Sequence, residues 1–185
     1  VYHYDLADGD ADATDYNGHG SNVSSIVASS DTIYTGMAPA ADIIHLKVFQ
    51  DNGFGSFSYV EQALQWVIAN ADSYNIASVN MSLGDRNNWN SPQSRYGIGD
   101  ELATLADMDV AVVSASGNSF YGFNSFQGVS YPAADPNSLS IGAVFDSNIG
   151  SGITWSSGAT AYTTERDRIT PFSQRHETLS DVFAP

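Results

Sequence analysis

The spacing of apolar and polar positions along the chain predicts alternating strands and helices. Apolar, β-rich runs predict strands over residues 42–49, 77–82, 110–115 and 138–144, and the third run is apolar enough to be buried on both faces. Helices are expected over 19–28, after residue 58 and over 100–106. The second of these has Ser58 and Glu61 as a capping box and one apolar face, made of Val60, Ala63, Leu64, Val67, Ile68 and Ala71. This alternation predicts a parallel sheet with right-handed crossovers, followed by shorter strands and long loops in the last third.

Composition and charge narrow the class of protein. The 185 residues are 42% hydrophobic, enough for one sizeable core and one domain. Six basic residues against 21 acidic ones give a net charge of −15, which argues against nucleic acid and anionic membranes as partners. The absence of cysteine excludes disulfides, Cys-ligated zinc and a thiol nucleophile, and no apolar run approaches the roughly 18 residues of a membrane span.

Two positions carry residue types suited to acyl transfer. His19 stands between Gly18 and Gly20 at the start of a helix, where the positive backbone dipole favours a neutral imidazole that can accept a proton. Asn118 follows a glycine at the end of an apolar strand, where its side-chain NH2 can point at a developing negative charge. Alone, such a histidine is more often a turn residue and such an asparagine a cap. Their roles as general base and oxyanion donor therefore depend on the surrounding motifs.

Those motifs, in their order along the chain, resemble the subtilisin-like serine peptidases, the subtilase family. The matching segments are His19–Ser24, Gly36–Pro39, Leu46–Phe49, Asn52–Gly55, Asn80–Gly84, Ala115–Asn118, Tyr131–Ala134, Phe172–Ser173 and Val182–Pro185. Each is weak by itself, but together they cover nearly the whole chain in the family's order. The resemblance implies an α/β fold, a subtilisin-like three-layer sandwich with a central, mostly parallel sheet and helices on both faces. Residues 1–185 would form an incomplete domain, part of a subtilase catalytic domain.

The resemblance also implies a function and its residues. The expected activity is that of a serine endopeptidase that hydrolyses peptide bonds by acyl transfer, with His19 as general base and then acid and Asn118 stabilising the oxyanion. The expected substrate is a polypeptide bound as an extended strand between two edges. The expected substrate-binding residues are Gly53, Phe54 and Gly55 on one edge, Ser82, Leu83 and Gly84 on the other, and Ala115, Ser116 and Gly117.

Two family motifs do not occur in the sequence. The catalytic aspartate, in an Asp-Thr-Gly motif, is expected before Val1, and the serine, in a Gly-Thr-Ser-Met-Ala motif, shortly after Pro185. We expect truncation, not substitution, to account for this, so that the segment alone does not turn over substrate. The alternative from another class is a non-catalytic domain of the same fold, either peptide-binding or a calcium-stabilised surface domain, whose parent gene lost both motifs.

An acidic loop precedes the first helix. Its alternating carboxylates are compatible with Ca²⁺, which takes six to eight oxygen ligands, and the four positions concerned are Asp8, Asp10, Asp12 and Asp15. A solvated acidic loop is the alternative, favoured because the distant bidentate glutamate of an EF-hand is lacking. The segment between Ala28 and Gly36 is also short for the calcium loop of well-known family members.

The remaining expectations concern surroundings and partners. The chemistry requires no cofactor, and calcium would be structural only. We expect a monomer that acts on polypeptides and binds neither nucleic acid nor a membrane. The family resemblance implies an extracellular or cell-surface location, with signal and propeptide not present in this segment.

Overall fold

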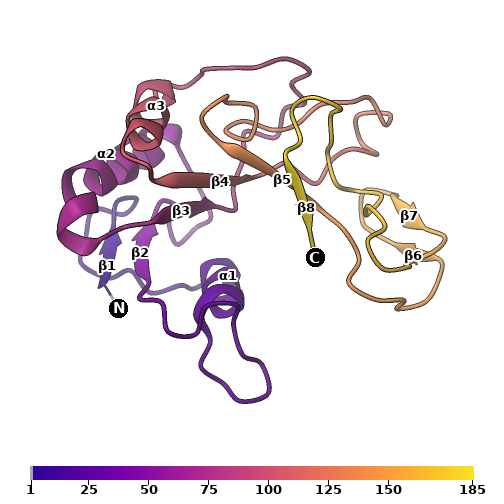
Figure 1. Ribbon diagram of the computed structural model, residues 1–185, viewed down its shortest axis with the longest axis horizontal. Helices are drawn as coiled ribbons and strands as arrows, with labels where there is room; N and C mark the ends of the chain where they lie inside the picture. Colours follow the sequence, from indigo (N-terminus) through magenta and orange to yellow (C-terminus); the bar gives the residue numbers. More distant parts are fainter. Residues whose placement is uncertain (1) are drawn as a thin grey trace. The chain divides into compact units, whose positions relative to one another are not determined.

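The computed structural model describes residues 2–185, which divide into two compact units. One unit ends at Val67, and the other runs from Ile68 to Pro185. The first contains β1 (Tyr2–Asp5), α1 (His19–Ala28) and β2 (Ile44–Lys47), and α2 (Phe57–Tyr74) crosses the boundary (Figure 1). The second contains β3 (Ser78–Met81), α3 (Gly99–Asp107), β4 (Ala111–Ala115), β5 (Leu139–Ala143), β6 (Ile153–Thr154), β7 (Thr160–Ala161) and β8 (Val182–Ala184).

In the first unit, β1 and β2 form a parallel pair with Asp5 opposite Lys47. The first part of α2 buries its predicted apolar face, and its Trp66 stacks on Tyr2 with ring centroids 5.1 Å apart. The predicted capping box is wrong in its position. The helix begins at Phe57, and Ser56 precedes it, with its hydroxyl oxygen accepting the Ser58 N–H at 3.2 Å. Ser58 lies inside the first turn because Ser56 already satisfies an unpaired N–H of that turn.

In the second unit, β3, β4, β5 and β8 lie side by side as a parallel sheet (Figure 1). The predicted parallel α/β arrangement is therefore confirmed. Helix α3 packs against β4, and its Leu102 and Leu105 are fully buried. The last third holds the antiparallel pair β6–β7 and long loops, also as predicted.

The expectation that the 110–115 strand is buried on both faces is wrong. Val112 and Ser114 are buried, whereas Val113 and Ala115 are half-buried and Ala111 is exposed. The strand can hold a serine on its buried face because the Ser114 hydroxyl hydrogen-bonds the Ser138 hydroxyl at 2.6 Å.

Within residues 2–185, no helix has the length and apolar character needed to cross a bilayer.

Candidate active site

His19 is the first residue of α1, as the sequence predicted, and it is exposed. Gly18 precedes it in the left-handed region, with φ 88°. A Cβ on Gly20 would lie 2.8 Å from Cε1 of His45, so only glycine lets the His45 ring pack this closely against the helix start. The two glycines flanking His19 thus have different roles: one supplies a turn conformation, the other a close approach.

Asp15 holds the N-terminus of α1. Its carboxylate accepts the backbone N–H groups of Ser21 at 2.7 Å, Gly18 at 2.7 Å and Asn17 at 3.0 Å. The Ser21 N–H contributes most and, with the other donors, outweighs partial burial, so the pKa of Asp15 lies well below its ordinary value. Asp15 therefore fixes the backbone that carries His19. An aspartate three residues before a glycine at a helix start is a sequence signal for this role.

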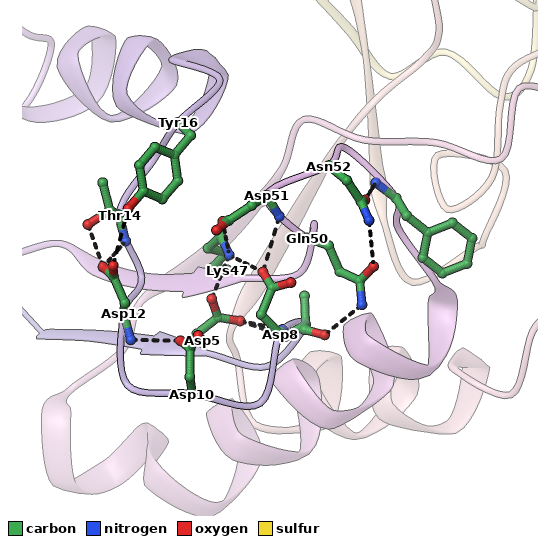
Figure 2. Close-up of polar contacts among 12 residues, drawn as sticks. Asp5, Asp8, Asp10, Asp12, Thr14, Tyr16, Lys47, Gln50, Asp51 and Asn52 are labelled. Atoms are coloured by element: carbon green, nitrogen blue, oxygen red, sulfur yellow. Dashed lines mark hydrogen bonds and ion pairs between the residues drawn. The ribbon is translucent and has the colours of Figure 1, made fainter.

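The acidic loop is organised by Lys47 (Figure 2). The Lys47 Nζ lies 2.5 Å from Oδ2 of Asp5, 2.5 Å from Oδ2 of Asp8 and 2.9 Å from Oδ1 of Asp51. Burial opposes the charge on Lys47, but the three carboxylates outweigh it and raise the pKa of the ammonium group. Asp5 is buried and also accepts the N–H groups of Ala7 and Asp8, so the chain turn after β1 is fixed at this ion pair.

The four carboxylates proposed for calcium have separate partners. Asp8 faces Lys47 and Asp15 caps α1, while Asp10 accepts the Asp12 N–H at 2.8 Å. Asp12 accepts the N–H and the hydroxyl of Thr14 and the hydroxyl of Tyr16 (Figure 2). Across residues 2–185, no group of three or more His, Asp or Glu side chains is arranged to hold a metal ion. In this structure the four carboxylates point to separate partners, and Lys47 offsets part of the charge around them.

The Gly53–Gly55 segment forms a tight turn after β2. Its backbone is largely occupied: Gly53 N–H donates to Gln50 C=O, and Phe54 C=O accepts the Gln50 N–H, both at 2.8 Å. The Phe54 N–H donates to Asn52 Oδ1 at 2.7 Å. The Phe54 side chain is 59% exposed, so this turn presents an apolar group outward.

In the second unit, the segments after β3 and β4 meet around Ser130. This buried residue donates its N–H to Ser116 C=O at 2.7 Å. A Cβ on Gly84 would lie 2.5 Å from the Ser130 hydroxyl, and one on Gly117 would lie 3.2 Å from the Ser130 Cβ. The structure therefore brings together two of the predicted substrate-binding segments, and Asn118 is exposed at the end of the second. Ligands of parallel sheets bind beyond the carboxyl ends of the strands, which is where this group lies.

Asp85, directly after Gly84, connects these loops and was missed by sequence reasoning. Its carboxylate accepts hydrogen bonds from the side chain or backbone of Asn87, Trp89, Tyr96, Ser130 and Tyr131. Burial opposes its ionisation, but the donors of Asn87, Trp89 and Tyr131 outweigh it and hold the pKa of Asp85 below its ordinary value. No local motif signals this role, because two of the donors lie 45 and 46 residues further along the chain.

The predicted site residues are distributed over both units. His19 and Gly53–Gly55 belong to the first unit, whereas Ser82–Gly84, Ala115–Gly117 and Asn118 belong to the second.

Comparison with known proteins defines the class. The family model described as the subtilase family, Peptidase S8, matches residues 1–185, and the chain belongs to this family. It is 32% identical to Subtilisin Savinase of Lederbergia lenta over 142 residues, and this aligned segment covers 76% of this chain and 47% of that protein. It is 34% identical over 132 residues to a thermostable alkaline protease of Halalkalibacterium halodurans, covering 70% of this chain and 32% of the relative.

A solved structure confirms the fold. The chain resembles the crystal structure of a cold adapted subtilisin-like serine proteinase with a TM-score of 0.65 and 25% identity, over 100% of this chain and 55% of the other. The chain thus spans about half the length of that protein, and its matches cover between about a third and a half of the curated relatives.

Proposed function

We propose that this chain carries the histidine, the oxyanion donor and part of the substrate-binding surface of a serine endopeptidase. The observation that carries the proposal is the subtilase family match over residues 1–185. The convergence of the Gly84 and Gly117 segments around Ser130 supports the assignment of individual residues.

His19 and Asn118 have complementary roles in the proposed reaction. The imidazole of His19 takes the proton of the attacking serine hydroxyl, and it then donates that proton to the leaving amine as the peptide C–N bond breaks. The Asn118 side-chain NH2 donates a hydrogen bond to the carbonyl oxygen as it becomes negatively charged. A water molecule hydrolyses the acyl-enzyme by the same two steps. The serine and the orienting aspartate belong to family motifs that the 185 residues do not contain.

The substrate-binding segments differ in what they offer a peptide. Within residues 2–185, the backbones of Leu83 and Gly84 form no hydrogen bond, so this segment is the proposed edge for an added strand. The backbone of the other segment is already occupied. The Ser116 N–H donates to Ile141 C=O, and the Ser116 C=O accepts the Ser130 N–H. The Gly117 C=O accepts the Gln174 N–H. Ala115, Ser116 and Gly117 therefore serve as a wall against a substrate side chain. Gly53, Phe54 and Gly55 contribute chiefly the exposed Phe54 ring.

The proposal includes no cofactor in the chemistry. The partner is a polypeptide, handled by a monomer that is extracellular or cell-surface. The net charge of −15 disfavours nucleic acid as a partner.

Reading the gene on both sides of this sequence tests the proposal. An Asp-Thr-Gly-like motif upstream and a Gly-Thr-Ser-like motif downstream are expected. A stop codon directly after Pro185, or another residue at the serine position, would overturn the peptidase proposal and favour a non-catalytic peptide-binding domain.

A further inference from the structure

We infer that Gln174 is a positioning residue for Asn118, which it holds through the backbone on both sides. The Gln174 N–H donates to Gly117 C=O at 2.8 Å, and the Gln174 Oε1 accepts the Ser119 N–H at 3.4 Å. Asn118 is the residue between these two contacts. The inference rests on the proposed function, because it assigns Gln174 a role in the oxyanion step.

The side-chain amide of Gln174 connects this loop to the loop after β3. Its NH2 group donates to Asn87 C=O at 2.9 Å and to Asn88 Oδ1 at 2.8 Å. Asn87 is in turn fixed by the carboxylate of Asp85, the residue that follows the proposed substrate edge at Leu83–Gly84. One buried amide therefore sets the spacing between the oxyanion loop and the loop that continues from the substrate edge.

The absence of a side chain at Gly117 leaves room for the side chain of Gln174. Gly117 has φ 108°, a conformation that favours glycine, and the Gln174 Oε1 occupies the space that a Gly117 side chain would need. Gln174 is only 1% exposed, so its side-chain amide depends on these protein partners for its hydrogen bonds. Asn118 itself is exposed. Its orientation is therefore inherited from the backbone that Gln174 fixes.

Small displacements of an oxyanion donor have large kinetic effects. The donor must lie about 2.7–3.1 Å from the developing oxyanion, and a misplacement of about 1 Å can cost roughly 100-fold in rate. Within residues 2–185, Gln174 makes none of its hydrogen bonds to the proposed substrate edge, Leu83–Gly84. The neighbouring Asp85 is held independently of Gln174 by donors of Trp89, Ser130 and Tyr131. A defect at Gln174 should consequently lower kcat more than it changes KM.

The test is a double-mutant cycle between Gln174→Met and Asn118→Ala, in the protein as its gene encodes it, on a peptide substrate. Methionine keeps the length and volume of glutamine but makes none of the amide hydrogen bonds. We expect Gln174→Met to lower kcat by about 10- to 100-fold with KM little changed. In the Asn118→Ala background the same substitution should lower kcat no further, because the group that Gln174 positions is already gone.

Thr164→Val is the matched control variant. Thr164 is also fully buried, and its hydroxyl accepts the Ile149 N–H and donates to Gly150 C=O. The substitution removes buried hydrogen bonds of the same unit without touching residues 115–119. It should lower stability but leave kcat unchanged.

Hydrogen exchange gives a readout that does not depend on activity. Gln174→Met should accelerate exchange of the Ser119 amide in a protein that is still folded, whereas Thr164→Val should leave that amide at the wild-type rate. Unchanged Ser119 exchange in Gln174→Met overturns the inference even if the variants cannot be assayed kinetically.

The kinetic outcomes separate the two claims. If Asn118→Ala alone keeps wild-type turnover, the oxyanion role and the inference built on it both fail. If Asn118→Ala is impaired but Gln174→Met is not, or if Gln174→Met is equally harmful in the Asn118→Ala background, only the inference is overturned and Gln174 is a purely structural residue.

Discussion

Asp85 illustrates how one carboxylate can organise several loops. It is half-buried and directly follows the proposed substrate edge. The residues that donate hydrogen bonds to it belong to segments outside the helices and strands. Loops of this kind lack a hydrogen-bond ladder, so a charged acceptor with several donors replaces one. The ionised form of Asp85 is the form that these donors stabilise.

Asp85→Asn should therefore destabilise the protein in a pH-dependent way. The folded-state pKa of Asp85 is lowered, so its contribution is present above the ordinary pKa of about 3.9 and is lost as the pH falls below it. At pH 7 we expect a loss of about 1.5–3 kcal/mol in the free energy of unfolding, measured by urea titration. Asp72→Asn, at an exposed position on α2, is the control and should have little effect. An equal loss for Asp85→Asn at pH 7 and at pH 3 would contradict this role.

Motifs in the sequence indicate candidate site residues, but they do not indicate the residues that hold those candidates in place. His19, Gly84 and Asn118 stand in short segments that are weak singly and become informative through their order along the chain. Gln174 acts on residues 86 and 87 positions earlier in the chain, and nothing near it in the sequence marks that contact. Supporting residues of this kind are defined by tertiary contacts, so a sequence read without the fold does not show them.

Helix α1 is held at both ends by neighbouring loops. None of its residues is buried within the described part of the chain, and hydrogen bonds join it to the loops on either side. Asp15 caps its start, and the segment from Gly36 to Ala38 folds back on its end, where Met37 N–H donates to Ile26 C=O at 3.0 Å and Ala38 N–H to Val27 C=O at 2.7 Å. A Cβ on Gly36 would lie 2.5 Å from Ser29 N, which explains why this return needs glycine.

Asp15→Asn should weaken α1. The loss in the free energy of unfolding should be about 0.5–2 kcal/mol at neutral pH, the range typical of N-cap residues. Because the folded-state pKa of Asp15 is lowered, the stabilisation is present above about pH 3.9 and decreases as the pH falls further. Denaturant unfolding at several pH values measures it, with Asp42→Asn at an exposed position as control. A difference from wild type that stays constant down to pH 2 would show that the carboxylate charge is not what caps the helix.

At the scale of elements, the spacing of apolar residues predicts a helix or strand well when that element buries one face. Helix α2 was predictable because its apolar face is buried as a continuous stripe. Its first residue was not, because Ser56 and Ser58 both fit a cap and the choice depends on backbone geometry. The sidedness of β4 was missed because a run of small apolar residues does not reveal which face neighbouring elements cover.

The charge of the whole molecule is strongly negative, and one lysine offsets part of the charge around its acidic loop. Lys47 is the sole Lys or Arg among residues 1–67, and it lies among three aspartates of that segment. Carboxylates packed together repel one another unless a cation or solvent screens them. Here Lys47 supplies one positive charge against three carboxylates, and the exposed Asp10 and Asp12 are left to solvent.

We expect calcium to have no effect on stability through this loop, because within residues 2–185 its carboxylates form no group arranged to hold a metal ion. The difference in unfolding temperature between excess calcium and a chelator should be the same, or zero, for wild type and for the Asp10→Asn, Asp12→Asn double variant. Lys47→Met should lower the unfolding temperature of the protein in either condition, because it leaves Asp5 buried without its partner. A calcium-dependent rise seen in wild type but lost in the double variant would restore the calcium-loop hypothesis.

Peptide hydrolysis through His19 and Asn118 is tested most directly by turnover of a peptide substrate in the protein as its gene encodes it. His19→Ala should reduce kcat severely. Asn118→Ala should reduce kcat roughly 100- to 1000-fold, about 2.7–4 kcal/mol of barrier, with little change in KM; this range is the one known for the oxyanion donor of subtilisin, a member of the same family, and is carried over from it. Wild-type turnover in either folded variant would contradict the proposed mechanism.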